Sequence, residues 1–416
     1  MLQTGVEQSL LDEQLDDGYL FPSSEDYCFA NVNPTALSVL GASVDRELPH
    51  QVFDGVETNV DRVVVVFLDG YGWEDWQRDY EDVPLLSLLT ERGTVTPLTS
   101  IYPSETAAAV TTFHTGRTPV EHGLLGWFQY VDDIDATLQT LPFVTLDGEP
   151  AGDVYPEYGP ESLYDGSSIY ERAAEDGVES RLYHSFEPKS PSAGATEATF
   201  ETVADLGVQL RHQVEADDGA DYHFAYLPHI DTAAHQVGTD ADRYRARLAM
   251  VTESLRRELV EDVDSTVADD TLLLLTADHG IVDTVPDENV DLRADEELYE
   301  ALRRDDEGDP IPPVGSARNV HLHLRDGSVE WARDHFESQY PCRTFTRQEA
   351  IDRGIFGDRE PSDLFRRRCG DLIVVHENRG MWWEDKELDL IGMHGGLTRD
   401  EMLVPFAAAR LSELQQ

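Results

Sequence analysis

The sequence predicts an α/β fold with a mostly parallel central sheet and helices on both faces. Two continuous apolar runs, Val63–Leu68 and Thr271–Thr276, are typical of strands buried on both faces of a parallel sheet. Other short apolar runs alternate along the chain with segments of helical periodicity, which is the element order of parallel α/β folds. The 416 residues can form two ordinary domains or one large α/β domain.

The elements can be predicted in order along the chain. The first sixty residues are acidic and show little periodicity, so we expect them to be irregular. A proline at its start and a glycine after its end predict a helix over Pro84–Arg92. We expect further helices over Thr106–His114, Ser168–Asp176 and Asp240–Val263, and further strands over Thr94–Thr99, Arg181–Phe186, Tyr222–Leu227, Asp371–Val375 and Met402–Phe406.

Two segments interrupt this alternation. Residues 128–166 are rich in Asp, Gly, Pro and Tyr, and residues 281–368 are charged and mixed in pattern. We therefore expect one catalytic domain over residues 1–416 with insertions at about 128–166 and 281–368. The aromatic side chains in or near the first insertion are expected to pack its own small core; they are Trp127, Phe128, Tyr130, Tyr155 and Tyr158.

The charge is strongly acidic along the whole chain. Asp and Glu number 83 against 31 Lys and Arg, a net charge of −52, and only two of the cations are lysines. A chain-wide excess of acid, unlike an acidic tail, indicates a hydrated surface whose self-repulsion is screened by salt. We interpret the chain as a protein of a salt-rich, halophilic cytoplasm. A basic footprint for nucleic-acid binding is missing.

Targeting signals and a disulfide framework are also missing from the sequence. The first twenty residues lack a basic start and an apolar run, and no apolar stretch reaches the ~18 residues of a membrane span. The three cysteines are far apart and form no CxxC pair. These observations predict a soluble, cytoplasmic protein without a membrane partner, and they do not indicate an oligomeric state.

Carboxylates and histidines follow the predicted buried strands. Asp69 follows the first run, Asp231 and His235 follow Tyr222–Leu227, and Asp278 and His279 follow Thr271–Thr276. Carboxyl ends of parallel strands meet at one edge of a sheet, where ligands bind. His394 lies in a glycine-lined loop before the last predicted strand. Asp and His side chains gathered in this way suit Zn²⁺ or Mn²⁺.

Each of these residues alone has an ordinary structural explanation. An Asp after a strand often caps a helix, and a DxxxH spacing also occurs on solvated helix faces. Ser104 and Thr106 precede or open the predicted helix 106–114, where a hydroxyl can cap the helix or face a bound phosphate. The combined order and strand context favour a metal site.

Taken together, the motifs resemble the alkaline phosphatase superfamily, and within it the nucleotide pyrophosphatase/phosphodiesterase branch. The resemblance rests on Asp69, Thr106 ten residues before Gly116, Asp231xxxHis235, Asp278-His279, His394-Gly-Gly, Thr115-Gly116 and His122-Gly123. It implies an alkaline-phosphatase-like three-layer sandwich and two divalent ions, zinc or alternatively manganese. One ion would be held by Asp231, His235 and His394, and the other by Asp69, Asp278 and His279, with Thr106 as the nucleophile.

The chain departs from that branch at two places. Ala107, Ala108 and Ala109 stand where Phe-Pro-Asn usually follows the nucleophile, and Trp127 stands in place of an asparagine that contacts a phosphoryl oxygen. Substrate specificity therefore does not carry over. The sulfatase signature Cys-x-Pro-Ser-Arg is absent around Pro103 and Ser104, which argues against a sulfatase.

The resemblance implies a two-metal hydrolase of phosphodiester or pyrophosphate bonds that works through a phospho-threonine intermediate. Its substrate would be a small phosphorylated molecule, with a nucleotide as one candidate. The alternatives are a phosphonate-cleaving enzyme, a phosphomonoesterase or phosphomutase, or a non-catalytic metal-stabilised binding protein. A phosphomonoesterase needs cations that meet a dianionic phosphoryl group, for which Arg117 and Arg379 are candidates.

The charge yields a first testable prediction. Because a net charge of −52 repels itself most strongly when screening is weak, the melting temperature should rise steeply between ~0.1 M, where the screening length is ~10 Å, and molar KCl. Differential scanning calorimetry over a KCl series measures this rise. An unchanged melting temperature would contradict the halophile interpretation.

Overall fold

The central sheet of the computed structural model has seven strands, in the order β4-β20-β11-β3-β10-β8-β9. The structure describes residues 1–185, 191–216 and 221–416. Strand β20 runs antiparallel to its two neighbours, and the other strands of this sheet are parallel to one another. The strands are β3 (Arg62–Leu68), β4 (Thr94–Thr99), β8 (Ser180–His184), β9 (Ala195–Thr199), β10 (Tyr222–Leu227), β11 (Thr271–Thr276) and β20 (Leu403–Arg410).

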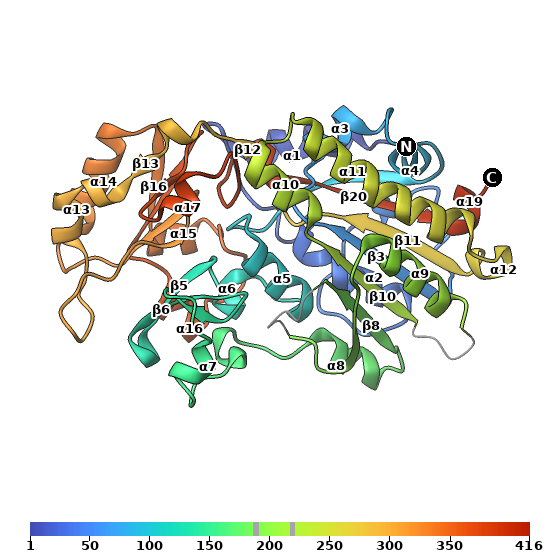
Figure 1. Ribbon diagram of the computed structural model, residues 1–416, viewed down its shortest axis with the longest axis horizontal. Helices are drawn as coiled ribbons and strands as arrows, with labels where there is room; N and C mark the ends of the chain where they lie inside the picture. The colour runs from blue at the N-terminus through green and yellow to red at the C-terminus, as the bar shows by residue number, and fades with distance from the viewer. Residues whose placement is uncertain (186–190, 217–220) are drawn as a thin grey trace.

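Helices cover both faces of this sheet (Figure 1). Helices α2 (Val32–Val39), α5 (Thr106–Thr115) and α8 (Ile169–Glu175) pack together on one face. Helices α4 (Pro84–Arg92), α9 (Val203–Val214) and α11 (Asp242–Leu255) pack on the other. The predicted three-layer α/β class is confirmed, and both apolar runs that predicted it form central, buried strands.

The packing around Phe67 shows how the sheet holds α5. The Phe67 ring lies edge-on to Phe29, Phe113 and Phe224, with ring centroids 5.6, 5.5 and 5.7 Å apart. Phe113 belongs to α5, all of whose residues are buried. The apolar and small residues of α5 therefore fix this helix against the sheet, and the start of α5 lies at the carboxyl edge of β3.

A second, antiparallel sheet lies beside the first (Figure 1). Its order is β16-β17-β15-β14-β5-β6-β7, and a separate hydrophobic cluster that includes Phe128, Tyr130 and Trp382 packs on it. The strands are β5 (Phe128–Val131), β6 (Ala136–Gln139), β7 (Val144–Thr145), β14 (Val314–Ser316), β15 (Asn319–Leu322), β16 (Cys342–Thr346) and β17 (Leu372–His376). Both predicted insertions supply strands to it, while the single-domain organisation stays a prediction.

The sequence-based prediction is wrong about the sheet to which one strand belongs. The run Asp371–Val375, predicted as a core strand, forms β17 in the second sheet, between β15 and β16. Ile373 and Val375 face the main core, whereas Leu372 and Val374 face the core of the second sheet. The strand is therefore buried on both faces, and its composition imitates that of a parallel core strand.

The first sixty residues are more regular than expected. They contain α1 (Thr4–Gln14) and α2, as well as two short strands, β1 (Leu15–Asp16) and β2 (Tyr19–Leu20). Helix α1 has one buried residue, Leu10, and α2 is buried at every position from Val32 to Leu37. In α1 only Val6, Leu10 and Leu11 pack against the core, so its apolar face is short, and α2 has no one-sided apolar stripe because it is buried on every side.

Several other predicted elements have different bounds. The strand predicted over Met402–Phe406 is β20, which extends to Arg410. The strand predicted over Arg181–Phe186 is β8, which ends at His184, and Phe186 lies outside the described residues. The long helix predicted over Asp240–Val263 is α11, followed by a π-helical turn at Arg256–Glu261.

The remaining elements are short. The helices are α3 (Trp73–Asp79), α6 (Pro119–His122), α7 (Ala151–Val154), α10 (His229–Val237), α12 (Ser265–Ala268), α13 (Glu296–Ala301), α14 (Val329–Gln339), α15 (Arg347–Asp352), α16 (Asp363–Arg368), α17 (Asp385–Leu388), α18 (Arg399–Met402) and α19 (Leu411–Leu414). The small strand pairs are β12 (Val282–Asp283) with β19 (Gly392–Met393), and β13 (Val290–Asp291) with β18 (Met381–Trp382).

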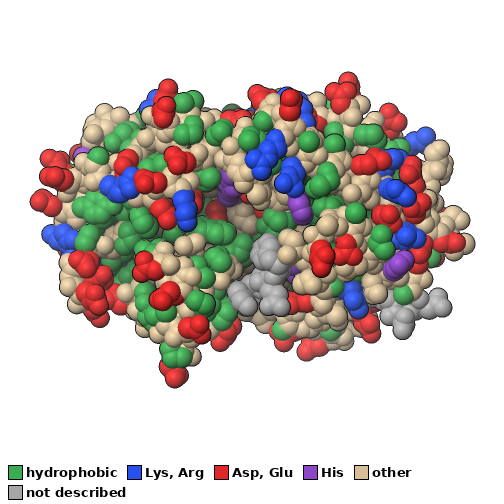
Figure 2. All heavy atoms as spheres, viewed as in Figure 1, with side chains coloured by type: hydrophobic (Ala, Val, Ile, Leu, Met, Phe, Trp, Pro, Cys, Tyr) green, Lys and Arg blue, Asp and Glu red, His purple; other side chains and the backbone are tan. Residues whose placement is uncertain are grey.

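The surface is acidic over the face shown in Figure 2, where Asp and Glu side chains are spread across both halves of the molecule. Within the described ranges, no helix has the length and apolar character needed to cross a membrane.

Candidate active site

The predicted site residues come together at the carboxyl edge of the central sheet. Asp69 follows β3, Asp278 and His279 follow β11, and α10 begins two residues after β10. The remaining residues are Asp231 and His235 on α10, Thr106 at the start of α5, and His394 directly after β19.

One group of candidate ligands consists of Asp231, His235 and His394. One ligand atom from each residue lies within 4.8 Å of the other two. Because α10 places residues four apart on one face, His235 Nε2 lies 3.1 Å from Asp231 Oδ2. His394 Nε2 lies 3.8 Å from the other oxygen, Oδ1. His235 Nδ1 lies 2.7 Å from the carbonyl oxygen of Gly392, which orients the ring so that Nε2 faces the site.

A second group consists of Asp69, Asp231 and His279, again with ligand atoms within 4.8 Å of one another. Asp231 is therefore common to both groups. His279 Nε2 lies 3.5 Å from Asp69 Oδ1 and 3.4 Å from Asp278 Oδ2. The His279 and His394 rings stack with centroids 3.7 Å apart, so the two groups are direct neighbours.

The carboxylates at this edge are crowded and buried. Burial, together with the nearby carboxylates of Asp278 and Asp231, raises the pKa of Asp69 well above its usual range. Burial also raises the pKa of Asp278, although His279 opposes the shift. Burial alone would lower the pKa of His235, but Asp231 outweighs it and raises the pKa to about 9. Cations bound at this edge would relieve the repulsion among these carboxylates.

Two buried carboxylate oxygen atoms without a hydrogen bond indicate where cations would fit. Asp231 Oδ1 and Asp278 Oδ2 are buried and make no hydrogen bond with the described residues. The other oxygen of Asp278 accepts hydrogen bonds from the N–H groups of Gly70 and His279, at 3.2 and 3.0 Å. Buried carboxylate oxygens without partners are rare in folded proteins. Together with three histidines, they form a donor set that suits Zn²⁺ or Mn²⁺.

Thr106 lies at the junction of these groups. Its hydroxyl oxygen is 3.1 Å from His279 Nε2 and 3.5 Å from Asp69 Oδ1. Helix α5 begins at Thr106, as predicted. Ser104, two residues earlier, points away, because its hydroxyl donates to the carbonyl oxygen of Gly396 at 2.7 Å.

A cavity of about 400 Å³ opens above Thr106 and runs between the two sheets. The metal-site side chains form one wall, and Trp127, Gln139, Leu141 and Ser316 line the opposite side. Trp127 lines the cavity and also packs, partly buried, against the core of the second sheet, to which Phe128 and Tyr130 belong. The other members of that core lie within residues 292–393, and Tyr158 is buried in the main core with Tyr155 against it, so the prediction that these aromatic side chains form a core of the insertion alone is wrong. Among the residues that the structure describes, no Lys or Arg lines this cavity.

Sequence reasoning missed three residues at the site. The Tyr226 hydroxyl donates to Asp69 Oδ2, and the only signal for it is the strand register, which pairs Tyr226 with Phe67. Glu105 precedes Thr106 and is buried beside the cavity, and burial raises its pKa to about 8 against the opposing effect of the Ala107 and Ala108 N–H groups. Glu387, from α17, lines the cavity, and no sequence pattern marks it.

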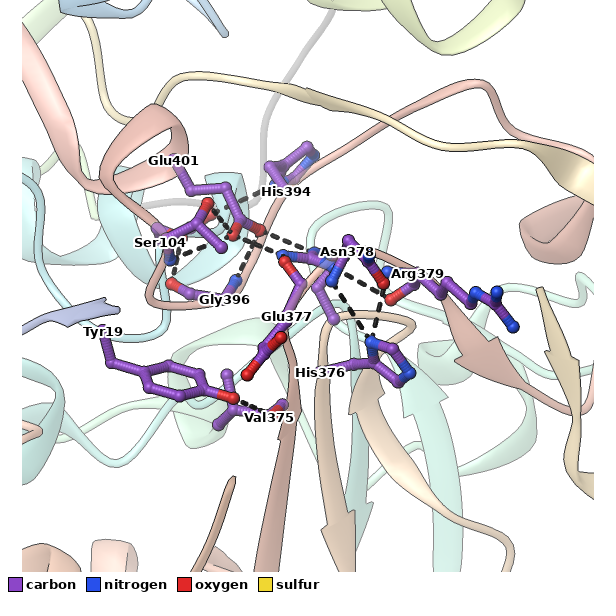
Figure 3. A network of polar contacts seen from close by, with 12 residues as sticks. Tyr19, Ser104, Val375, His376, Glu377, Asn378, Arg379, His394, Gly396 and Glu401 are labelled. Carbon is purple, nitrogen blue, oxygen red and sulfur yellow. Dashed lines mark hydrogen bonds and ion pairs between the residues drawn. The ribbon is translucent and has the colours of Figure 1, made fainter. Parts of the chain in front are cut away.

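A buried ion pair supports the loop that carries His394. Figure 3 shows one partner of this pair, Glu401, beside Gly396 and His394. Glu401 pairs with Arg318 at 2.6 Å, and both side chains are fully buried. The same carboxylate accepts hydrogen bonds from Gly396 N at 2.9 Å and from the Thr398 hydroxyl at 2.6 Å. His394 Nδ1 lies 3.2 Å from the carbonyl oxygen of Ser104. Glu401 therefore ties the His394 loop to the second sheet, which carries Arg318.

The fold and this site define a metal-dependent phosphoryl hydrolase. The model of the family "Type I phosphodiesterase / nucleotide pyrophosphatase" matches residues 63–397, and the chain belongs to this family. No curated protein sequence matches the chain.

Solved structures with the same fold include murine ectonucleotide pyrophosphatase/phosphodiesterase 5, an inactive variant in complex with AMP. It is 15% identical, with a TM-score of 0.63, over 84% of this chain and 88% of that chain. Phosphonoacetate hydrolase from Sinorhizobium meliloti 1021, in complex with phosphonoformate, is 18% identical, with a TM-score of 0.60, over 86% of this chain and 95% of that chain.

The ion pair behind the His394 loop yields a second testable prediction. Glu401→Gln leaves the Arg318 charge buried without a counter-charge, which should destabilise the fold by about 3–5 kcal/mol. Because the His394 loop also loses its anchor, affinity for a divalent ion should fall roughly 10–100-fold. Chelator competition measures the affinity, and denaturant unfolding measures the stability.

Arg399→Ala is the matched control on the same helix. Arg399 forms ion pairs with Glu7 and Glu74, but its side chain is 40% exposed. Loss of exposed pairs should cost about 1 kcal/mol or less and leave metal affinity unchanged. If Glu401→Gln binds metal as tightly as the control, the loop does not depend on this ion pair.

Proposed function

We propose that the chain hydrolyses phosphodiester or pyrophosphate bonds of small molecules, with two divalent ions and Thr106 as the nucleophile. The observation that carries this proposal is the position of the Thr106 hydroxyl, 3.1 Å from His279 and 3.5 Å from Asp69, where two candidate metal groups share Asp231. A helix-capping role alone does not explain why the Thr106 hydroxyl lies beside His279 and Asp69.

Two ions fit the site better than one because the candidate ligands fall into two groups. Asp231, His235 and His394 would hold one ion. Asp69 and His279 of the second group would hold the other, with Asp278 as their third partner in place of the shared Asp231, because Asp278 Oδ2 lies 3.4 Å from His279 Nε2. When bound, the ions would neutralise the carboxylates and act as Lewis acids on phosphoryl oxygens. Three imidazoles and three carboxylates favour zinc, with manganese as the alternative.

The proposed reaction has two steps. The Thr106 oxygen attacks phosphorus and gives up its proton, the bond from phosphorus to the leaving group breaks, and the leaving group takes up a proton. Water then attacks the phospho-threonine, which releases the phosphate monoester and restores the hydroxyl. Helix α5 points its first turn at this position, and its macrodipole favours the negative charge of the phosphoryl group there.

The charge of the cavity supports a diester or pyrophosphate substrate over a phosphate monoester. A terminal phosphoryl dianion calls for cationic side chains, and the two candidates from the sequence lie elsewhere. Arg117 lines a different cavity, and Arg379 pairs with Glu288 at 3.0 Å. The described lining of the active-site cavity contains no Lys or Arg.

The solved relatives agree with a small phosphorylated substrate, since they hold AMP and phosphonoformate. The half-exposed Trp127 in the cavity wall offers a flat surface to an organic leaving group, such as a nucleobase. As part of the same proposal, the acidic charge of the chain supports a salt-rich cytoplasm as the location of this activity.

Substitutions at the two hydroxyl residues test the nucleophile. Thr106→Ala should reduce hydrolysis of bis-p-nitrophenyl phosphate by several orders of magnitude, because the attacking oxygen is removed. Metal content, measured by mass spectrometry of the dialysed protein, should stay at two ions per chain. Ser104→Ala is the matched control and should lose far less activity, since the Ser104 hydroxyl donates its hydrogen bond to the Gly396 carbonyl oxygen.

Three outcomes would contradict the proposal. If Ser104→Ala is the inactive variant, the nucleophile is Ser104. If neither variant loses activity, the phospho-threonine intermediate is wrong. If the unaltered protein binds metal in molar KCl but hydrolyses neither bis-p-nitrophenyl phosphate, p-nitrophenyl phosphate nor a nucleotide sugar, the non-catalytic metal-binding protein becomes the better description.

A further inference from the structure

A second cavity lies at the carboxyl end of α5, away from the active site. Its volume is about 360 Å³, and four arginines line it: Arg46, Arg117, Arg172 and Arg359. Because α5 is ten residues long and rises 1.5 Å per residue, this end of the helix lies about 14 Å from Thr106. The two cavities have no lining residue in common.

The lining of this cavity carries more positive than negative side chains, whereas the chain as a whole is strongly negative. Four guanidinium groups meet two carboxylates in the lining, and each carboxylate already has an arginine partner. Asp45 pairs with Arg172 at 2.7 Å, and Glu121 pairs with Arg46 at 3.1 Å. Arg117 and Arg359 form no ion pair with the residues that the structure describes. In a chain with a net charge of −52, this cavity therefore keeps an excess of positive charge.

The surroundings contain some compensating acid. A shallower hollow next to this cavity shares Asp45, Arg46 and Arg359 with it and adds Glu25 and Asp358. These two carboxylates line the neighbouring hollow and not the cavity itself. Within the lining of the cavity itself, the four arginines therefore still outnumber the two carboxylates.

Arg46 provides a second, independent observation. Its side chain is only 9% exposed, and Nη2 is taken by Glu121. Its Nη1 is buried and has no hydrogen-bond partner. A buried guanidinium N–H group without an acceptor is costly, and Arg46 is one of the residues that line this cavity.

We propose that this cavity binds a small phosphorylated molecule through its phosphate group. Guanidinium groups bind phosphate oxygens in charge-assisted, often bidentate pairs, and several arginines favour a dianion over a carboxylate or chloride. The apolar side chains of Pro34, Val44 and Ile169 line the rest of the cavity, which has room for an organic group beyond the phosphate. The carboxyl end of α5 repels an anion, so the arginines must supply the attraction.

Calorimetric titration of the metal-loaded protein with inorganic phosphate in molar KCl tests this site. High salt removes non-specific attraction, so only a built site should retain the anion. The unaltered protein should bind one phosphate more per chain than the double variant Arg117→Ala/Arg359→Ala. Phosphate bound at the active site is counted equally in both proteins, so failure of the proposed catalytic function does not affect the comparison.

The controls separate this site from general charge effects. Arg92→Ala/Arg243→Ala removes two exposed arginines elsewhere and should bind phosphate like the unaltered protein. Arg46→Lys keeps the charge beside Glu121 but removes the unpaired Nη1, and should weaken phosphate binding at least tenfold without lowering the melting temperature. Equal stoichiometry and affinity in all four proteins would overturn the proposal.

Discussion

Three carboxylates buried at one edge of a parallel sheet are the constraint on which this structure depends. Asp69, Asp231 and Asp278 lie close together because β3 and β11 end, and α10 begins, at the same edge. Burial raises the pKa of Asp69 and Asp278, and the repulsion among these groups opposes folding unless cations or protons neutralise them. The histidines, the Tyr226 hydroxyl and the Thr106 hydroxyl are all arranged around this concentration of negative charge.

The second sheet gives the site its shape. It closes the cavity above Thr106 with Trp127, Gln139 and Ser316, and through Arg318 it anchors Glu401 and the His394 loop. The carboxyl edge of the central sheet thus positions most of the candidate site residues, and the second sheet supplies one wall and the support of one candidate ligand. The arginine-lined cavity at the far end of α5 takes no part in the active site.

Much of the fold and of the chemistry could be predicted from the sequence, because doubly buried strands are plain apolar runs and the residues that follow them must meet at one edge. The bounds of β4, β10, β11 and α4 agree with the predictions. The same rule failed for β17, which is buried between two cores and therefore has the composition of a central parallel strand. Helices α1 and α2 were missed because the apolar face of α1 is limited to Val6, Leu10 and Leu11, and α2 is buried on every side from Val32 to Leu37.

The walls of the site could not be predicted, for physical reasons. Tyr226, Glu105 and Glu387 reach the cavity through strand register, helix start and tertiary packing, none of which leaves a local pattern in the sequence. Arg318 and Glu401 lie 83 residues apart, and nothing in either segment indicates that they meet. Long-range packing decided these positions.

The central claim, that this edge of the sheet holds two metal ions beside Thr106, is tested most directly by anomalous X-ray diffraction from crystals grown with zinc or manganese. We expect two anomalous peaks about 4 Å apart, one among Asp231, His235 and His394 and the other among Asp69, Asp278 and His279. A single peak, or peaks away from these six side chains, would contradict the account.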